Sequence, residues 1–353
     1  MEELKEQEYY NGDDFINSKD LYGRKPEIFI SQSLRSYGKT TYYHNRAVKG
    51  FLENKKQFCM LYRNINEVKG AASRLQGIVA PFFRGLKLNE NLYAGNAISE
   101  ISLDNGDVMA YAFALSGYEK IKKNSNLFSN ADHILFDEFL NEDNKYLKGE
   151  VDKLISVHTS VARAPGTPVR RVPVFLISNK INIMNPYFIA LGIVERLQPR
   201  TRKLRGDGWI LEIQNNVGLK NQLKESAFNR AFASQAYMGY ITDENNKFVN
   251  EMIDVGKIKG DKRYIHTFVQ NGEEFGCWIC NGLYYISQSV QPNFRRIIGV
   301  EISDRILTPL DNINYNMLLL RYRKAFEQGL VRYSNGHCKQ MFVNYLLKYG
   351  DYN

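Results

Sequence analysis

Eight consecutive residues near the N-terminus of the 353-residue chain have types and a spacing that could bind phosphate groups. Residues 33–40 read Ser-Leu-Arg-Ser-Tyr-Gly-Lys-Thr, which fits the P-loop pattern G-x-x-x-x-G-K-[ST] except that Ser33 replaces the first glycine. In such a loop backbone N–H groups surround the phosphates, the lysine neutralises their charge and the threonine hydroxyl ligates Mg²⁺. We therefore predict that the loop binds ATP and Mg²⁺ through these residues: Ser33, Leu34, Arg35, Ser36, Tyr37, Gly38, Lys39, Thr40 and Thr41.

Two consecutive acidic residues, Asp137 and Glu138, directly follow the apolar residues 133–136. An apolar strand that ends in Asp-Glu is typical of the Walker B motif of P-loop ATPases. We expect Asp137, with Thr40, to hold Mg²⁺, and Glu138 to orient and deprotonate the attacking water. The alternative is a pair of solvated acids at a strand end, but the phosphate loop upstream favours the catalytic interpretation.

Further polar residues occupy places where they could contact the nucleotide. Ser178 and Asn179 follow the apolar residues 173–177, and ligands of open parallel sheets bind at the carboxyl ends of strands. This pair could sense the γ-phosphate, although a helix N-cap would use the same residue types. Arg35, inside the phosphate loop, could contact the γ-phosphate or transmit the geometry of the loop to a neighbouring subunit.

Other cations are candidates for action across a subunit interface. An arginine finger stabilises charge in the transition state of phosphoryl transfer. Arg163 is the first candidate because it closely follows the helix expected after Glu138, and Arg170 and Arg171 are alternates. Lys122 and Lys123 precede the Glu138 strand and could reach ATP in the same or an adjacent subunit. Each of these cations could instead be a solvated surface charge.

The elements around these motifs alternate between strands and helices. We predict strands at 27–31, 57–62, 133–136, 173–177 and 209–213, helices at 40–52, 65–85 and 150–159, and a β-hairpin at 98–115 that turns at Asn105-Gly106. Such alternation predicts an α/β domain with a parallel sheet and crossover helices.

The pattern of predicted helices and strands changes in the second half of the chain. Residues 217–240 have a helical composition, and short strands at 263–270, 275–280 and 283–288 precede helices at 312–328 and 339–348. We therefore predict an ATPase domain at 1–214, a helical linker or lid at 215–245 and a smaller α+β domain at 246–353.

Composition and charge indicate a protein that works with a polyanion. The net charge is +9, and residues 161–205 contain nine Lys or Arg and one acid, Glu195. No apolar run is long enough to span a bilayer, so we expect an intracellular protein with no membrane partner. The Cys277-x-x-Cys280 spacing falls on a predicted strand, which places the thiols on opposite faces and argues against a zinc site.

Four short motifs together resemble the DNA-packaging ATPases of phi29-type bacteriophages. They are residues 35–40, 134–139, 176–179 and 185–188, and softer similarity extends to residues 275–286 and 322–333. The resemblance implies an ASCE-type P-loop ATPase whose catalytic glutamate lies on a strand beside the P-loop strand. It also implies a degenerate RNase H-like second domain related to the terminase nuclease.

Function and partners follow from the same resemblance. It implies an ATP-driven translocase of double-stranded DNA that assembles as a homopentameric ring on the portal of the procapsid, in the host cytoplasm. Members of that family also work with a packaging RNA, and the residues do not decide whether this chain does. Basic residues that could bind nucleic acid in the second domain are Lys257, Lys259, Lys262, Arg263, Arg295, Arg296, Arg321, Arg323 and Lys324.

Three other functions fit parts of the same pattern. A different ring ATPase, such as a helicase or a conjugation motor, would share the nucleotide motifs. A scaffold that binds nucleic acid could carry a vestigial ATP site. A terminase with an active nuclease needs three or four converging carboxylates to hold two metal ions. The acids after residue 245 are few and scattered, so we expect the second domain to bind nucleic acid without cutting it.

Overall fold

The computed structural model describes residues 10–141, 145–163, 169–179, 183–198, 201–214, 221, 223, 225–232, 256, 258–293, 297–300 and 312–348. The chain divides into two compact units. The first comprises Met1–Asn141, Tyr146–Lys180 and Arg202–Glu225, and the second comprises Glu142–Lys145, Ile181–Thr201 and Ser226–Asn353. Within the described residues, no helix combines the length and apolar character that crossing a bilayer requires.

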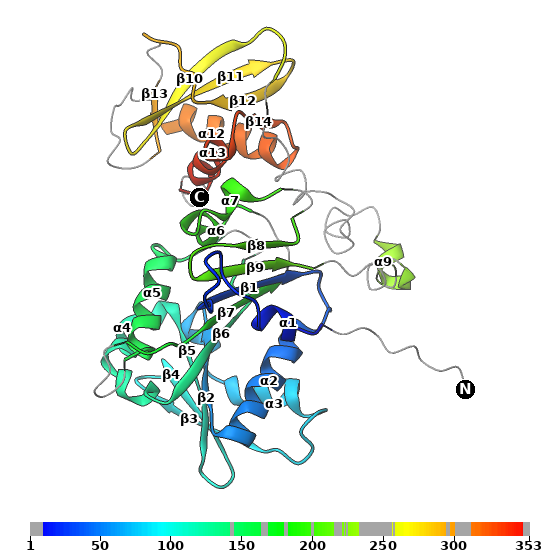
Figure 1. The fold of residues 1–353 in the computed structure, drawn as a ribbon, viewed down its shortest axis with the longest axis vertical. Coiled ribbons are helices and arrows are strands. Elements are labelled where there is room, and N and C mark those ends of the chain that lie inside the picture. The colour runs from blue at the N-terminus through cyan, green and yellow to red at the C-terminus, as the bar shows by residue number, and fades with distance from the viewer. Residues whose placement is uncertain are drawn as a thin grey trace. The chain divides into compact units, whose positions relative to one another are not determined.

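A nine-stranded sheet forms the centre of the first unit (Figure 1). Its spatial order is β3-β4-β5-β2-β6-β7-β1-β9-β8. The strands from β5 to β9 in this order run parallel, and β3, β4 and β8 add antiparallel edges. The strands are β1 (Ile28–Ser33), β2 (Gln57–Tyr62), β3 (Leu88–Tyr93), β4 (Ile98–Leu103), β5 (Val108–Ala114), β6 (Ala131–Asp137), β7 (Val174–Asn179), β8 (Lys203–Arg205) and β9 (Trp209–Ile213).

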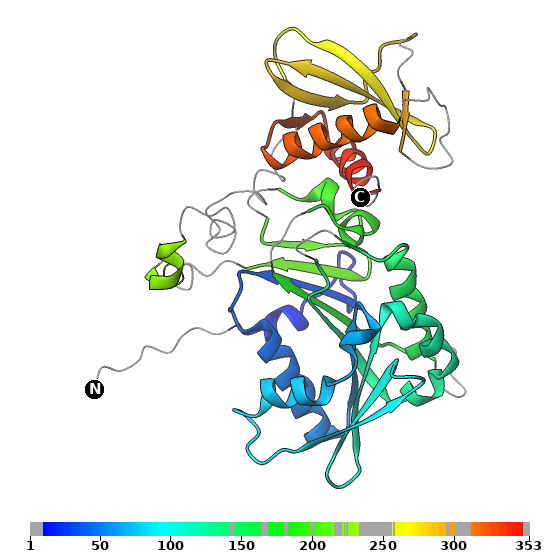
Figure 2. The ribbon, with the colours of Figure 1, turned by 180° about the vertical axis from the view of Figure 1, so that it is seen from behind.

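Helices cover both faces of this sheet (Figures 1 and 2). Helices α2 and α3 pack on one face, and α4 and α5 lie on the other. The central strands β1, β5, β7 and β9 are buried along nearly all of their length, because helices cover both faces of the sheet. The helical elements are α1 (Asp13–Ile16), α2 (Lys39–Asn54), η1 (Ile65–Glu67), α3 (Ala71–Val79), η2 (Leu115–Gly117), α4 (Tyr118–Lys123), η3 (Ser125–Phe128) and α5 (Glu150–Val161). The α/β class predicted from the sequence is confirmed.

The strand order corrects one expectation. The resemblance placed the strand of Glu138 beside the P-loop strand, but β7 lies between β6 and β1. Leu176 of β7 pairs with Ile30 on one side and with Phe136 on the other. The alternation of strands and helices is the same for both orders, so the sequence pattern could not distinguish them.

Two local predictions also change. Residues 65–85 do not form one helix, because Gly70 adopts a φ of 81° and separates η1 from α3. Strands β3 and β8 were not predicted. The first is largely exposed and the second has three residues, so neither has a clear apolar periodicity.

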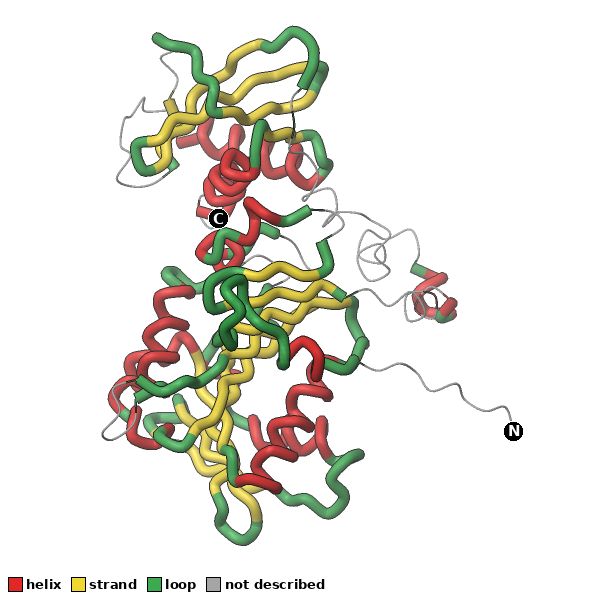
Figure 3. Tube along the Cα trace, in the orientation of Figure 1, coloured by secondary structure: helices red, strands yellow, loops and turns green. Residues whose placement is uncertain are grey.

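The second unit contains a five-stranded sheet with the order β13-β10-β11-β12-β14. Strands β10 (Arg263–Gln270), β11 (Glu273–Cys280) and β12 (Leu283–Ser287) form an antiparallel meander, and β13 (Ile297–Gly299) and β14 (Val331–Tyr333) run parallel to its edges. The meander turns at Asn271-Gly272 and Asn281-Gly282, where all four residues have positive φ, as two-residue hairpins prefer. Helices α12 (Asn312–Glu327) and α13 (Gly336–Lys348) pack against the sheet (Figure 3).

Residues 183–198 belong to this second unit, whereas we predicted them in the ATPase domain. Their helices α6 (Pro186–Ala190) and α7 (Ile193–Arg196) contact α13. The Gln340 side chain donates a hydrogen bond of 2.6 Å to the carbonyl of Ile189. Gly336 permits this packing, because a Cβ there would lie 2.2 Å from the carbonyl oxygen of Glu195. Of the predicted connector at 217–240, the structure shows α9 (Ala227–Ala231), and most of the remainder lies outside the described residues.

Candidate nucleotide-binding site

A cavity of about 290 Å³ lies where β1, β6 and β7 end. Parallel strands bring their carboxyl ends to one edge of the sheet, so motifs that are far apart in the sequence meet there. The cavity therefore brings the phosphate loop, the acidic pair and the end of β7 together. Its lining residues are Ser36, Tyr37, Gly38, Lys39, Thr40, Thr41, Asp137, Glu138, Ser178 and Asn179.

The phosphate loop places the start of α2 at this cavity. β1 ends at Ser33 and α2 begins at Lys39, so the free N–H groups of the helix face the cavity end of the sheet. Gly38 has a φ of 90° and Ser36 a φ of 62°. Lys39 is 5% exposed, and its ammonium donates a hydrogen bond to the hydroxyl of Ser33. The residue that replaces the first glycine thus contacts the lysine. Ser33, Leu34 and Arg35, which we also predicted to contact the nucleotide, do not line the cavity.

Replacing Gly38 by alanine is expected to weaken ATP binding by about tenfold or more, because a left-handed backbone costs about 1–3 kcal/mol for a residue with a Cβ. Titration with a fluorescent ATP analogue would measure the loss. Gly85→Ala is a matched control: Gly85 has a φ of 81°, an added Cβ would meet no atom within 4 Å, and it does not line the cavity. This control should lose stability and keep its ATP affinity. Equal affinities for the two variants would contradict the prediction.

The acidic pair occupies a sharp turn at the end of β6. Asp137 is the last residue of the strand, and Glu138 has a φ of 55°, which non-glycine residues rarely adopt. The backbone N–H of Glu138 donates to Asp137 Oδ1 at 3.0 Å, and that of Phe139 donates to the Ile177 carbonyl at 3.3 Å. Both acids line the cavity, and the Glu138 side chain is exposed to solvent.

Ser178 and Asn179 end the strand that separates the two motifs. In the sheet, Gln32 pairs with Ser178 and Ser33 pairs with Asn179. The end of β7 therefore lies beside the start of the phosphate loop, at the cavity. Ser178 is 2% exposed, and its Oγ has no hydrogen-bond partner among the residues that the structure describes. Buried hydroxyls are normally hydrogen-bonded, so a bound ligand could supply the partner that Ser178 lacks.

The cations predicted to act across a subunit interface are absent from the cavity lining. Arg163 is exposed just beyond the C-terminal end of α5. Arg170 donates to the carbonyls of Phe128 and Val161 at 2.7 Å each and also to that of Ala131. Burial lowers the pKa of its guanidinium.

Arg171 donates to the carbonyl of Pro26, ahead of β1 and thus at the opposite end of the sheet from the cavity. Lys122 and Lys123 are exposed on α4. Arg170 and Arg171 thus donate to backbone carbonyls of their own chain, whereas Arg163 is exposed beyond the end of α5.

A buried cluster that no motif indicated supports the phosphate loop. The N–H of Tyr10 donates to the carbonyl of Tyr37 at 3.0 Å. The hydroxyl of Tyr10 lies 2.9 Å from that of Tyr43 and donates to Glu212, to which Ser31 also donates at 2.7 Å. Burial raises the pKa of both tyrosines, so they stay protonated as donors. Tyr10 belongs to none of the motifs or elements predicted from the sequence, so its contacts with the phosphate loop and Glu212 appear only in the fold.

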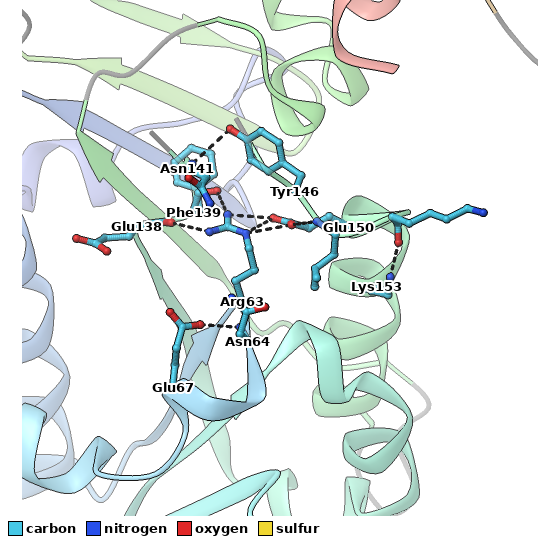
Figure 4. Close-up of polar contacts among 11 residues, drawn as sticks. Arg63, Asn64, Glu67, Glu138, Phe139, Asn141, Tyr146, Glu150 and Lys153 are labelled. Atoms are coloured by element: carbon cyan, nitrogen blue, oxygen red, sulfur yellow. Dashed lines mark hydrogen bonds and ion pairs between the residues drawn. The ribbon is translucent and has the colours of Figure 1, made fainter. Parts of the chain in front are cut away.

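A second set of contacts that the sequence did not reveal surrounds the Glu138 turn (Figure 4). Arg63 follows β2, and its guanidinium contacts the backbone of the turn and the carboxylate of Glu150. In the sequence, Arg63 could be noticed only as an arginine directly after an apolar strand. Its partner Glu150 lies 87 residues later, so the sequence does not show that the two pair.

The thiols of the C-x-x-C spacing contact different groups. Cys277 Sγ lies 3.3 Å from the Tyr322 hydroxyl, and Cys280 Sγ lies 3.5 Å from the Lys259 carbonyl. Within the described part of the chain, no three His, Cys, Asp or Glu residues are grouped to hold a metal ion. Lys257, Arg295 and Arg296, which we predicted to bind nucleic acid, lie outside the described residues.

Comparison with known proteins gives a consistent result. A family described as podovirus DNA encapsidation protein (Gp16) matches residues 7–349. A DNA packaging protein of Bacillus phage phi29 is 25% identical over 237 residues, which are 65% of this chain and 69% of the relative. A DNA packaging protein of Bacillus phage B103 is 23% identical over 308 residues, covering 85% of this chain and 90% of the relative.

Solved structures have the same fold over most of their length. The bacteriophage phi29 viral genome packaging motor assembly is 21% identical with a TM-score of 0.60, over 93% of this chain and 95% of that chain. The phi28 gp11 DNA packaging motor is 16% identical with a TM-score of 0.57, over 97% of this chain and 98% of that chain.

Proposed function

The chain belongs to the podovirus DNA encapsidation protein (Gp16) family, and we propose that it hydrolyses ATP to drive double-stranded DNA into a viral procapsid. The observation that carries this proposal is the single cavity lined by the phosphate loop, the acidic pair and the end of β7. Such a site can hold a nucleoside triphosphate by its phosphates and place a carboxylate beside the terminal one. The resemblance noted in the sequence is confirmed by the family match.

The residues divide the chemistry among them. Backbone N–H groups at the start of α2 and the Lys39 ammonium bind the phosphates. Thr40 and Asp137 offer the hydroxyl and carboxylate oxygens that Mg²⁺ prefers, and both line the cavity. When bound, Mg²⁺ neutralises charge on the β- and γ-phosphates. Glu138 accepts a proton from the attacking water, and Ser178 and Asn179 sense the γ-phosphate.

The remaining charged residues act outside the cavity. Arg163 completes the site of a neighbouring subunit, and Arg35 links the phosphate loop to that interface. Lys122 and Lys123 are further candidates for contact with ATP in an adjacent subunit. These roles require a ring, which we propose to be a homopentamer of this chain at the portal of the procapsid, within the host cell.

The basic residues supply the contact with DNA. Residues 161–205 contain nine Lys or Arg and one acid, and such a segment can bind phosphates without reading bases. The second unit, which we interpret as a degenerate RNase H-like domain, adds Lys259, Lys262, Arg263 and Arg321, all exposed. A packaging RNA is a second polyanion that these residues could bind.

Phosphate release by the purified chain tests this function. We expect hydrolysis that depends on Mg²⁺, stops when EDTA removes the metal, and increases with duplex DNA and with procapsids. ATP-dependent movement along intact duplex supports a packaging motor, whereas unwinding of a forked duplex would indicate a helicase. DNA binding without stimulated phosphate release would indicate a scaffold, and metal-dependent cleavage of a plasmid would indicate an active nuclease.

A further inference from the structure

We propose that Arg63 and Glu150 are positioning residues that hold the turn of Glu138 in its working conformation and connect it to helix α5. This inference rests on the proposed ATPase function and names residues that act through Glu138. Arg63 follows β2, which pairs with β6, and Glu150 begins α5 on the other side of the turn. The two side chains meet across the residues that follow Asp137 (Figure 4).

The guanidinium of Arg63 contacts three different oxygen-bearing groups. Its Nε lies 3.2 and 3.1 Å from the two carboxylate oxygens of Glu150. One terminal nitrogen donates to Glu150 Oε1 at 3.1 Å and to the Phe139 carbonyl at 2.6 Å, and the other lies 3.5 Å from the Glu138 carbonyl. The guanidinium carbon of Arg63 lies 5.7 Å from the ring centroid of Phe136 and 5.4 Å from the ring centroid of Tyr146. Arg63 thus contacts two successive backbone carbonyls of the turn, those of Glu138 and Phe139.

The backbone of Glu138 needs such a restraint. A non-glycine residue at a φ of 55° is in a sparsely populated conformation, which persists when its surroundings fix it. The carboxylate of Glu138 is exposed and lines the cavity. A change in the backbone conformation of Glu138 would redirect this carboxylate, and Arg63 contacts the carbonyls of Glu138 and Phe139.

A contribution to folding stability does not by itself explain the ion pair between Arg63 and Glu150. The side chains of Arg63 and Glu150 are 11% and 0% exposed, and buried ion pairs often contribute no more to stability than apolar residues of similar volume. A planar guanidinium, however, can contact a carboxylate and a carbonyl in a fixed geometry, which an ammonium cannot do. The observed geometry uses this property, since one terminal nitrogen bridges Glu150 and Phe139.

Glu150 extends the connection to α5. Besides binding Arg63, its Oε2 accepts a hydrogen bond of 2.7 Å from the backbone N–H of Leu147. It is the first residue of the helix whose other end precedes Arg163. A shift of the Glu138 turn would therefore act on the N-terminal end of α5 through one fully buried carboxylate.

The test variant is Arg63→Lys, because an ammonium still compensates the buried Glu150 carboxylate and so preserves the fold. We expect kcat for ATP to fall by about tenfold or more, since small misplacements of catalytic groups cost up to about 100-fold. The KM for ATP and the affinity for a fluorescent ATP analogue should stay within about threefold of wild type, because Arg63 does not line the cavity. Arg63→Gln should lose at least as much kcat, and thermal unfolding followed by circular dichroism reports whether each variant is folded.

Arg74→Lys is the matched control. Arg74 is exposed, donates to the Lys69 carbonyl at 3.1 Å and lies 5.0 Å from the Tyr62 ring, but it does not contact the Glu138 turn. Its kcat should equal that of wild type. If folded Arg63→Lys keeps kcat within twofold of wild type, or if kcat and ATP affinity fall together, the positioning role is overturned. A wild-type protein without ATPase activity in the same assay overturns the proposed function and this inference together.

Discussion

Glu138→Gln is expected to bind ATP with near wild-type affinity and to lose about 100-fold or more of its turnover. The amide occupies the same volume at the end of β6 but cannot accept the proton of the attacking water, and general bases contribute about 10²–10⁴ in rate. The N–H of Glu138, which donates to Asp137 at 3.0 Å, is unchanged by the substitution. Phosphate-release kinetics and titration with a fluorescent ATP analogue separate the two effects.

Glu53→Gln provides the control for a lost carboxylate. Glu53 is exposed near the C-terminal end of α2, where it lies 3.8 Å from Lys49 in a surface ion pair, and such pairs contribute little. Its turnover should match wild type. Near-normal turnover by Glu138→Gln would remove Glu138 from the proposed mechanism and would leave the acidic pair with Mg²⁺ binding alone.

Arg163→Ala is expected to lower ATP turnover by about 10³-fold in assembled rings, because an arginine finger is worth about 10³–10⁵ in rate. The affinity of an isolated subunit for ATP should not change, since Arg163 does not line the cavity of its own chain. Mixing Arg163→Ala with Glu138→Gln subunits distinguishes action in trans. Sites that combine an intact Glu138 with an arginine from the neighbour should recover turnover that neither variant has alone.

Arg84→Ala is a suitable control, since Arg84 is an exposed arginine in the loop after α3. It should leave turnover unchanged in rings of the same size. If Arg163→Ala rings hydrolyse ATP at the wild-type rate, the finger is another residue. Arg171 would be tested next, because Arg170 binds three backbone carbonyls that would lose their partner if it moved.

The elements that carry the nucleotide motifs could be predicted because they combine two local signals. The strand before Lys39 and the strand before Glu138 are short apolar runs followed by residues with distinctive chemistry, and β2 and β9 have the bounds that we predicted. The order of the strands could not be predicted, because any order that buries the same apolar faces satisfies the same periodicity. The position of β7 between the motifs therefore appears only in the fold.

The supporting contacts of the site could not be predicted for a related reason. The hydrogen bonds of Tyr10 to Glu212 and of Arg63 to Glu150 join residues that are 202 and 87 positions apart. An isolated arginine or glutamate in a sequence has the same appearance whether it is solvated or buried. The grouping of residues 183–198 with the second unit could not be predicted because α6 and α7 are short, and this grouping depends on contacts with α13.

In the proposed ring, helix α5 would lie between the Glu138 turn of one subunit and an arginine that acts on the next. Its twelve residues span about 18 Å, with Glu150 beside the Glu138 turn at one end and Arg163 beyond the other. If Arg163 acts in the ATP site of a neighbouring subunit, α5 connects the Glu138 turn of its own ATP site to an arginine of the neighbouring site. The two ends of α5 differ chemically, because one carries the buried Glu150 carboxylate and the other precedes the exposed Arg163. Sequential firing around such a ring would then have a handedness that is fixed within each subunit before DNA is bound.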